Sequence, residues 1–291
     1  MQTHAAALTM VRDDTFFLDK WLRYYGGLFG RENCYVVNHG RGPEVAEMAA
    51  GCNVIGLPGQ ADPMFERKRW RLLNGMVAGL LGYYAHVVVG DVDELVVMDP
   101  ATGQDLLSWL ATKRRPRVYT PIGLDVIHRI DREEAPVGDH VLGPRRHVKL
   151  LPYHSKPCVL GRPAQLSRGG HYAKAENLNT PEGLYLFHLK FCDFGQYVRA
   201  MDRRNAVVEE IGVGVKETSI GRHWFAEARG EDRAVFESFR LLEERSGFEL
   251  DWLRREMQES WAPRGETGFW QFDRKDYGVL YQLPERFFGV I

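Results

Sequence analysis

The stretch His86-Val-Val-Val-Gly-Asp91-Val-Asp93-Glu94 places three valines before two carboxylates that are two positions apart. Valine favours a buried strand, and alternate side chains of an extended backbone share one face. We therefore expect Asp91 and Asp93 to converge at the carboxyl end of a strand, where open α/β sheets bind ligands. A short acidic pair of this kind is more often only a solvated turn. Here Glu94 adds a third acid between apolar runs, and clustered acids favour a cation or a basic partner.

The residues before this motif alternate between strand and helix periodicity, which is typical of a parallel sheet covered on both faces. The expected strands are Ala6 to Val11, Cys34 to Asn38, Asn53 to Leu57 and His86 to Gly90. The expected helices are Thr15 to Phe29, Pro43 to Ala50 and Pro63 to Leu81.

The residues after the motif are less regular. We expect, in order, a helix at Leu106 to Ala111, a strand at Arg117 to Thr120, ordered loops with few regular elements over Gly123 to Asn179, a strand at Leu184 to Phe191, and helices at Phe194 to Ile211, Asp232 to Ser246 and Leu250 to Glu259. The Pro, Gly, Arg and His content of the middle region favours loops. The aromatic tail, Phe269 to Phe288, is expected to pack back onto the body.

Composition limits the function classes. A chain of 291 residues with 44% hydrophobic content can bury a substantial core. Its 38 basic and 39 acidic residues nearly cancel, so no global field attracts nucleic acid or an anionic membrane, although local basic patches remain allowed. An anionic ligand must therefore be bound by a local group of residues.

The cysteines and the N-terminus favour a cytoplasmic protein. Cys34, Cys52, Cys158 and Cys192 include no CxxC pair, which argues against a zinc knuckle and a disulfide scaffold. The N-terminus lacks the features of a signal peptide. The most apolar window, Gly75 to Val89, is too short and too mixed to span a bilayer. We expect no transmembrane segment, and peripheral association with the inner face of the membrane is left open.

Several segments occur in the same order in a known group of enzymes. They are Met10-Val-Arg-Asp-Asp14 with Phe17 to Tyr25, Arg67 to Asn74 ahead of the acidic motif, Ser155-Lys156-Pro157, His171, and Phe187-His188-Leu-Lys190. In this combination the sequence resembles family-2-like GT-A glycosyltransferases, particularly the branch related to glycosyltransferase family 92, over about residues 6 to 200. That group commonly has an Asn-Glu pair where Asp13 and Asp14 stand, a departure that keeps the turn acidic.

The resemblance implies a GT-A fold, with a Rossmann-like, mixed but mainly parallel sheet flanked by helices. Residues 1–200 would form the nucleotide-sugar-binding catalytic domain, and residues 201–291 a helical C-terminal extension packed on it. The implied activity is metal-dependent, inverting transfer of a sugar from a UDP- or GDP-sugar to a carbohydrate or glycan-precursor acceptor. Asp91 and Asp93 would bind Mn²⁺ or Mg²⁺ bridging the two phosphates of the donor, since hard carboxylate oxygens suit these ions.

Other residues receive roles from the same combination. Alternation places His188 and Lys190 on one face of their strand, where His188 would be a third metal ligand and Lys190 a phosphate partner. An ordinary polar strand face fits these two residues equally well. His171 competes with His188 for the metal, and Lys156 belongs to the Lys-Pro segment of the family.

The basic helix before the motif and the first acidic turn supply further donor-binding candidates. Arg67 or Arg71 would reach the diphosphate or the base, although such residues more often only solvate a helix surface. Asp13 or Asp14 would hydrogen-bond the nucleoside, and helix capping explains either residue equally well.

Inverting transfer needs a carboxylate that accepts the proton of the attacking hydroxyl. The candidates are Asp125 and Asp193, and Asp125 is preferred because it lies downstream of the metal motif beside a glycine-containing loop. A role as a turn residue is the commoner alternative for each.

Three alternatives remain. A sugar-phosphate nucleotidyltransferase would carry a Gly-rich basic loop after the first strand, where this chain has Arg12-Asp13-Asp14. A phosphatase of the haloacid dehalogenase type would place its DxD after the first strand. A non-catalytic carbohydrate-binding protein would use the seven tryptophans and twelve tyrosines for sugar stacking.

Overall fold

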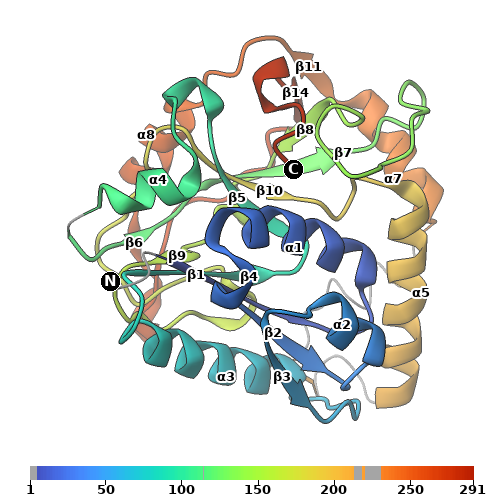
Figure 1. Ribbon diagram of the computed structural model, residues 1–291. Helices are drawn as coiled ribbons and strands as arrows, with labels where there is room; N and C mark the ends of the chain where they lie inside the picture. The colour runs from blue at the N-terminus through green and yellow to red at the C-terminus, as the bar shows by residue number, and fades with distance from the viewer. Residues whose placement is uncertain (1–4, 114, 213–217, 220–230) are drawn as a thin grey trace.

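The computed structural model describes residues 5–113, 115–212, 218–219 and 231–291 (Figure 1). Two six-stranded sheets form the centre of this described part. The first sheet has the order β3-β2-β1-β4-β9-β6. Its strands are β1 (Ala5–Val11), β2 (Cys34–His39), β3 (Asn53–Leu57), β4 (His86–Asp91), β6 (Val118–Tyr119) and β9 (Val159–Leu160).

Strands β1 to β4 are parallel, whereas β9 runs antiparallel to β4 and β6. Helices α1 (Thr15–Phe29) and α2 (Pro43–Met48) lie on one face of this sheet, and α3 (Phe65–Leu80) lies on the other (Figure 1). The alternation of β1 explains this layering, because Ala5 and Ala7 pack in the core with α1, whereas Ala6 and Leu8 pack with α3. The expected α/β architecture is confirmed.

The second sheet has the order β11-β14-β8-β7-β10-β5. Its strands are β5 (Glu94–Met98), β7 (Ile122–Ile127), β8 (His147–Leu150), β10 (Leu184–His188), β11 (Glu243–Arg245) and β14 (Val279–Gln282). Strand β10 pairs in parallel with β7 and antiparallel with β5. Because β4 belongs to the first sheet and β5 to the second, the turn at Val92 and Asp93 carries the chain from one sheet to the other.

Two expectations about the middle of the chain are wrong. Gly123 to Asn179 was expected to hold few regular elements, yet it contributes most of β7 together with β8 and β9. Strand β7 was missed because its segment Ile-Gly-Leu-Asp-Val-Ile has a glycine and an acid inside it, although every residue is buried. Strand β10 also ends at His188, earlier than the expected Phe191.

The C-terminal part is less helical than expected. Helices α5 (Phe194–Ile211), α7 (Asp232–Ser238) and α8 (Asp251–Glu259) are present, together with α4 (Leu106–Ala111) earlier in the chain. The helix expected to continue to Ser246 ends at Ser238, and β11 follows. Strands β11 and β14 complete the second sheet, while β12 (Ala262–Pro263) and β13 (Trp270–Gln271) pair with each other. The division at residue 200 falls inside α5 and stays a prediction.

The aromatic tail packs as expected, with Phe272 and Phe287 buried in the main core. No helix within the described ranges is long and apolar enough to cross a bilayer.

Candidate functional site

The acidic motif lies at the carboxyl end of β4, where Asp91 pairs in register with Met10 of β1. Arg69 of α3 contacts Asp91 Oδ1, and Lys156 Nζ lies 3.5 Å from Asp91 Oδ2. Burial alone would raise the pKa of Asp91, but the charges of Arg69 and Lys156 outweigh it and hold that pKa well below its usual range. Asp91 is therefore an anion whose two oxygens both face cations.

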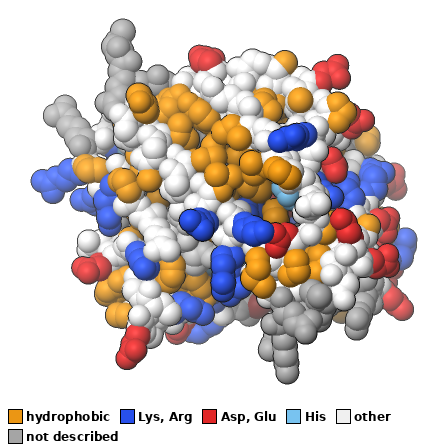
Figure 2. Space-filling view, turned by 90° about the horizontal axis from the view of Figure 1, so that it is seen from below, with side chains coloured by type: hydrophobic (Ala, Val, Ile, Leu, Met, Phe, Trp, Pro, Cys, Tyr) orange, Lys and Arg blue, Asp and Glu red, His pale blue; other side chains and the backbone are white. Residues whose placement is uncertain are grey.

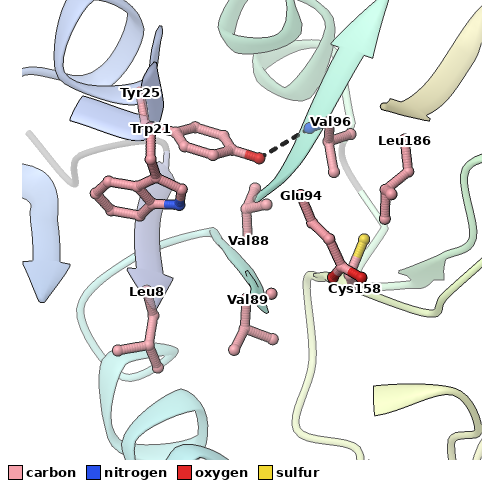
Figure 3. A pocket seen from close by; sticks show the side chains of 10 residues that line it. Leu8, Trp21, Tyr25, Val88, Val89, Glu94, Val96, Cys158 and Leu186 are labelled. Atoms are coloured by element: carbon pink, nitrogen blue, oxygen red, sulfur yellow. Dashed lines mark hydrogen bonds between the residues drawn. The ribbon is translucent and has the colours of Figure 1, made fainter. Parts of the chain in front are cut away.

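Glu94 is a buried partner rather than a third surface acid. Figure 3 shows its side chain beside Cys158, in a pocket lined mainly by apolar side chains. Its Oε1 contacts Lys156, and its Oε2 accepts a hydrogen bond from the backbone N of Asp91 at 3.2 Å. Burial opposes the charge of Lys156, but Glu94 and Asp91 together raise its pKa above the ordinary value. Lys156 is thus a cation shared between two carboxylates of the motif.

His188 joins the two sheets electrostatically. Its Nε2 lies 3.3 Å from Asp93 Oδ2, and its Nδ1 lies 2.8 Å from Asp125 Oδ1. Burial would lower the pKa of His188, yet Asp93 and Asp125 raise it to about 10. The imidazole is therefore a cation held between two carboxylates. The sequence predicted that His188 and the acidic motif come together, and this geometry is present.

His154 is the second imidazole of this group. Its Nδ1 lies 2.6 Å from Asp125 Oδ1, and its ring centroid is 4.1 Å from that of His188. Burial lowers the pKa of His154, and the attraction of Asp125 only partly offsets this. Potential ligand atoms of Asp125, His154 and His188 all lie within 4.8 Å of one another, close enough for a metal ion. Hydrogen bonding to Asp125 accounts for the same distances.

The two proposed catalytic carboxylates are placed differently from the sequence interpretation. Asp125 is only 1% exposed, and one of its oxygens faces both His154 and His188. It therefore cannot meet a bulky acceptor directly. Asp193 accepts a hydrogen bond from Gln196 N at 2.9 Å as the N-cap of α5, and Arg145 lies 3.4 Å away. These contacts give Asp193 a structural role.

The first acidic turn lies at the same edge of the sheet. Asp14 caps α1 and its Oδ2 lies 2.8 Å from Arg203 Nη2. Burial raises the pKa of Asp14, and the charge of Asp93 raises it further, which indicates that the two acids are close. Asp13 has a largely exposed side chain and a left-handed backbone, with φ 52°.

The cation that α3 brings to the acidic motif is Arg69, rather than the expected Arg67 or Arg71. Arg67 and Arg71 are exposed on α3, whereas Arg69 contacts Asp91 and was missed by the sequence interpretation. The phase of the helix is the signal that would have found it, because Arg69 lies three residues after buried Glu66 and four before buried Leu73. The ammonium of Lys190 lies 4.9 Å from the Phe191 ring centroid.

His171 stands beside the group rather than in it. Its Nδ1 lies 3.2 Å from the carbonyl oxygen of Tyr153, and the two rings are 4.4 Å apart. Burial lowers the pKa of His171 most, and the positive charges of Lys156 and Arg274 lower it further. Figure 2 shows that basic side chains do gather locally, in spite of the neutral overall charge.

Comparison with known proteins leaves the function open. No protein-family model matches the chain, and no curated protein matches it. Among solved structures, the chain is similar to mannose-1-phosphate geranyltransferase from Thermus thermophilus, with 13% identity, 97% of this chain and 74% of that chain covered, and a TM-score of 0.29. A similarity of this size carries no argument about activity.

Proposed function

We propose that this protein is a glycosyltransferase that moves a sugar from a nucleoside-diphosphate sugar to a carbohydrate or glycan-precursor acceptor. The observation that carries the proposal is the position of Asp91 and Asp93 at the carboxyl end of a parallel strand, with the cations Arg69 and Lys156 beside Asp91. Ligands of open α/β sheets bind at this edge. Cationic groups at this edge suit a diphosphate, because hydrogen bonds from Arg and Lys to phosphate oxygens are strong.

The site has donor atoms that suit a divalent ion such as Mn²⁺ or Mg²⁺. Asp93 Oδ2 and His188 Nε2 are 3.3 Å apart, a separation that two ligands of one ion can have. Asp91 would join them only on release from Arg69 and Lys156. A metal would replace the proton that His188 carries between its two carboxylates. When bound, the ion would stabilise the negative charge of the departing nucleoside diphosphate.

The protein's own residues would divide the remaining work. Arg69 and Lys156 would exchange Asp91 for phosphate oxygens, because both cations keep a second carboxylate in Glu66 and Glu94. Asp125 is buried, so His154, whose side chain is 14% exposed, would accept the proton of the acceptor hydroxyl, and Asp125 would stabilise the resulting imidazolium. This pair replaces Asp125 alone as the candidate base.

The test is release of nucleoside diphosphate from UDP- and GDP-sugars by the purified chain, with and without Mn²⁺. We expect turnover with at least one donor and a loss of about a hundredfold or more in Asp93→Asn, in the range found when a charge-stabilising group is removed. Asp139→Asn changes an exposed carboxylate and is the control with unchanged turnover.

Other outcomes would contradict the proposal. Binding of sugars without turnover of any donor would favour a carbohydrate-binding protein. Formation of a nucleotide sugar from a sugar phosphate and a nucleoside triphosphate would favour a nucleotidyltransferase.

A further inference from the structure

A second group of cationic and aromatic side chains borders the acidic motif. The Arg274 guanidinium lies 4.1 Å from the ring centroid of Tyr172 and 4.6 Å from that of Tyr153. Its Nη2 donates a hydrogen bond to the carbonyl oxygen of His171 at 3.0 Å. We call Tyr153, His171, Tyr172 and Arg274 the Arg274 cluster. Three segments that are distant in sequence thus meet around one cation.

Arg274 differs from the cations of the acidic motif in the number of carboxylates that it faces. Within the described residues it forms no ion pair with a carboxylate, whereas Arg69 and Lys156 each face two. Its Nε is buried and has no hydrogen-bond partner among those residues. Burial lowers the pKa of Arg274, and the hydroxyl-bearing rings of Tyr172 and Tyr153 offset this only in part. Such a cation is costly unless an anion pairs with it.

The Arg274 cluster is continuous with the site described above. Tyr153 precedes His154 directly, and the residue is 41% exposed. The charges of Lys156, Arg274 and Asp91 all act on His171, which lies against Tyr153. A ligand held at the acidic motif can therefore extend toward Arg274.

We propose that Arg274 and the exposed ring of Tyr153 form an anion subsite that takes a phosphate group of a ligand bound at the acidic motif. The guanidinium pairs with no carboxylate among the described residues, its Nη2 donates to a backbone carbonyl, and arginine binds phosphate oxygens through paired donors. The rings of Tyr153 and Tyr172 hold its plane in place, which reduces the entropy lost on binding. The phosphate belongs either to a nucleotide donor or to a phosphorylated acceptor. This binding role does not require the transferase activity.

The test is calorimetric binding of inorganic pyrophosphate to the full chain, to Arg274→Gln and to Arg274→Lys. A charge-assisted hydrogen bond contributes enough that Arg274→Gln should raise Kd about ten- to a hundredfold, with Arg274→Lys in between. The dependence of Kd on salt should also weaken in Arg274→Gln. Arg264→Gln removes an exposed guanidinium that lies 4.7 Å from the Tyr172 ring centroid, and should leave Kd within about twofold.

Saturating UDP or GDP distinguishes the two sources of phosphate. Competition assigns the subsite to the nucleotide, whereas simultaneous binding of pyrophosphate assigns it to an acceptor. An unchanged Kd in Arg274→Gln, or no binding of pyrophosphate to the unaltered protein, would overturn the proposal. If Arg274→Gln does not fold, Arg274→Lys carries the test, because it keeps the charge and loses the fork of donors. Donor turnover is measured separately, so failure of the subsite and failure of the transferase proposal are distinguishable.

Discussion

Asp91 and Asp125 are the central carboxylates of the two sheets, and their surroundings differ in kind. Asp91 has a side chain that is 30% exposed and faces Arg69 and Lys156, whose charges are permanent at ordinary pH. The Asp125 side chain is 2% exposed and faces two imidazoles, which titrate. The first carboxylate can exchange its partners for a ligand. The second holds His154 and His188 in position.

The largest effect should come from removing the charge of Asp125. Asp125→Asn leaves His188 as a buried cation with Asp93 as its remaining carboxylate, and breaking a buried pair of this kind costs about 3 to 5 kcal/mol. Asp91→Asn should cost about 1 to 2 kcal/mol, because it removes a hydrogen-bonded charge from cations that keep other partners. Urea unfolding of both variants gives the two free energies.

The larger loss of stability in Asp125→Asn than in Asp91→Asn tests directly whether the two carboxylates differ. If Asp91→Asn lowers the free energy of unfolding as much as Asp125→Asn, the two carboxylates have equivalent structural roles. Asp139→Asn, at an exposed position, should change stability by less than about 0.5 kcal/mol and controls for the loss of a charge.

A smaller effect should come from Gly123, which fixes the backbone that carries His154. A Cβ at position 123 would lie 2.3 Å from the carbonyl carbon of His154 and 2.5 Å from Ser155 N. Gly123→Ala must therefore move the turn Pro152–His154, and overpacking of this kind costs about 1 to 3 kcal/mol. Gly75→Ala on the exposed side of α3 meets nothing within 4 Å and should stabilise by up to about 1 kcal/mol. Equal thermal shifts in the two variants would contradict the close approach.

The two sheets also differ in how well the sequence predicts them. The first sheet follows from local signals, since β1 to β4 alternate with α1 to α3 and consecutive strands pair in β1-β2 and β2-β3. The parallel pairing of β1 with β4 is the usual result of such alternation. In the second sheet, β8 pairs with β14 through Lys149 and Leu280. A strand that is stabilised by pairing with a distant segment need not have a periodic pattern of its own. The sequence around β8 therefore predicts a loop.

The site divides in the same way. The contact of Asp93 with His188 was predictable, because both residues follow or end buried strands at one edge. The convergence of Asp91 and Asp93 on one ion stays a prediction, since Asp91 faces Arg69 and Lys156 instead. His154 was missed because its contact with Asp125 depends on how the turn after β8 folds over β7. Arg274 was missed as well, since the balance of charge around a residue exists only in three dimensions.

The smallest expected effect is a pH dependence that separates the two carboxylates. The pKa of His188 is raised from 6.5 to about 10 in the folded protein. A raised pKa contributes stability that is fully present below the unfolded value and is lost as pH rises through the folded value. Between about pH 7 and pH 8.5 the free energy of unfolding should therefore fall by roughly 1 kcal/mol per pH unit. Urea unfolding measures this slope. The buffer contains EDTA, because a bound metal would displace the proton of His188.

Variants beside each of the two carboxylates show whether this slope comes from His188. His188→Gln should remove it, since glutamine carries no proton in this range, whereas Arg69→Gln should keep it because an arginine does not titrate there. The lowered pKa of His154 acts only below about pH 6.5 and does not enter this window. A slope that survives in His188→Gln would mean that the imidazole is neutral between its carboxylates. Asp93 and Asp125 would then lack the cation that joins the two sheets.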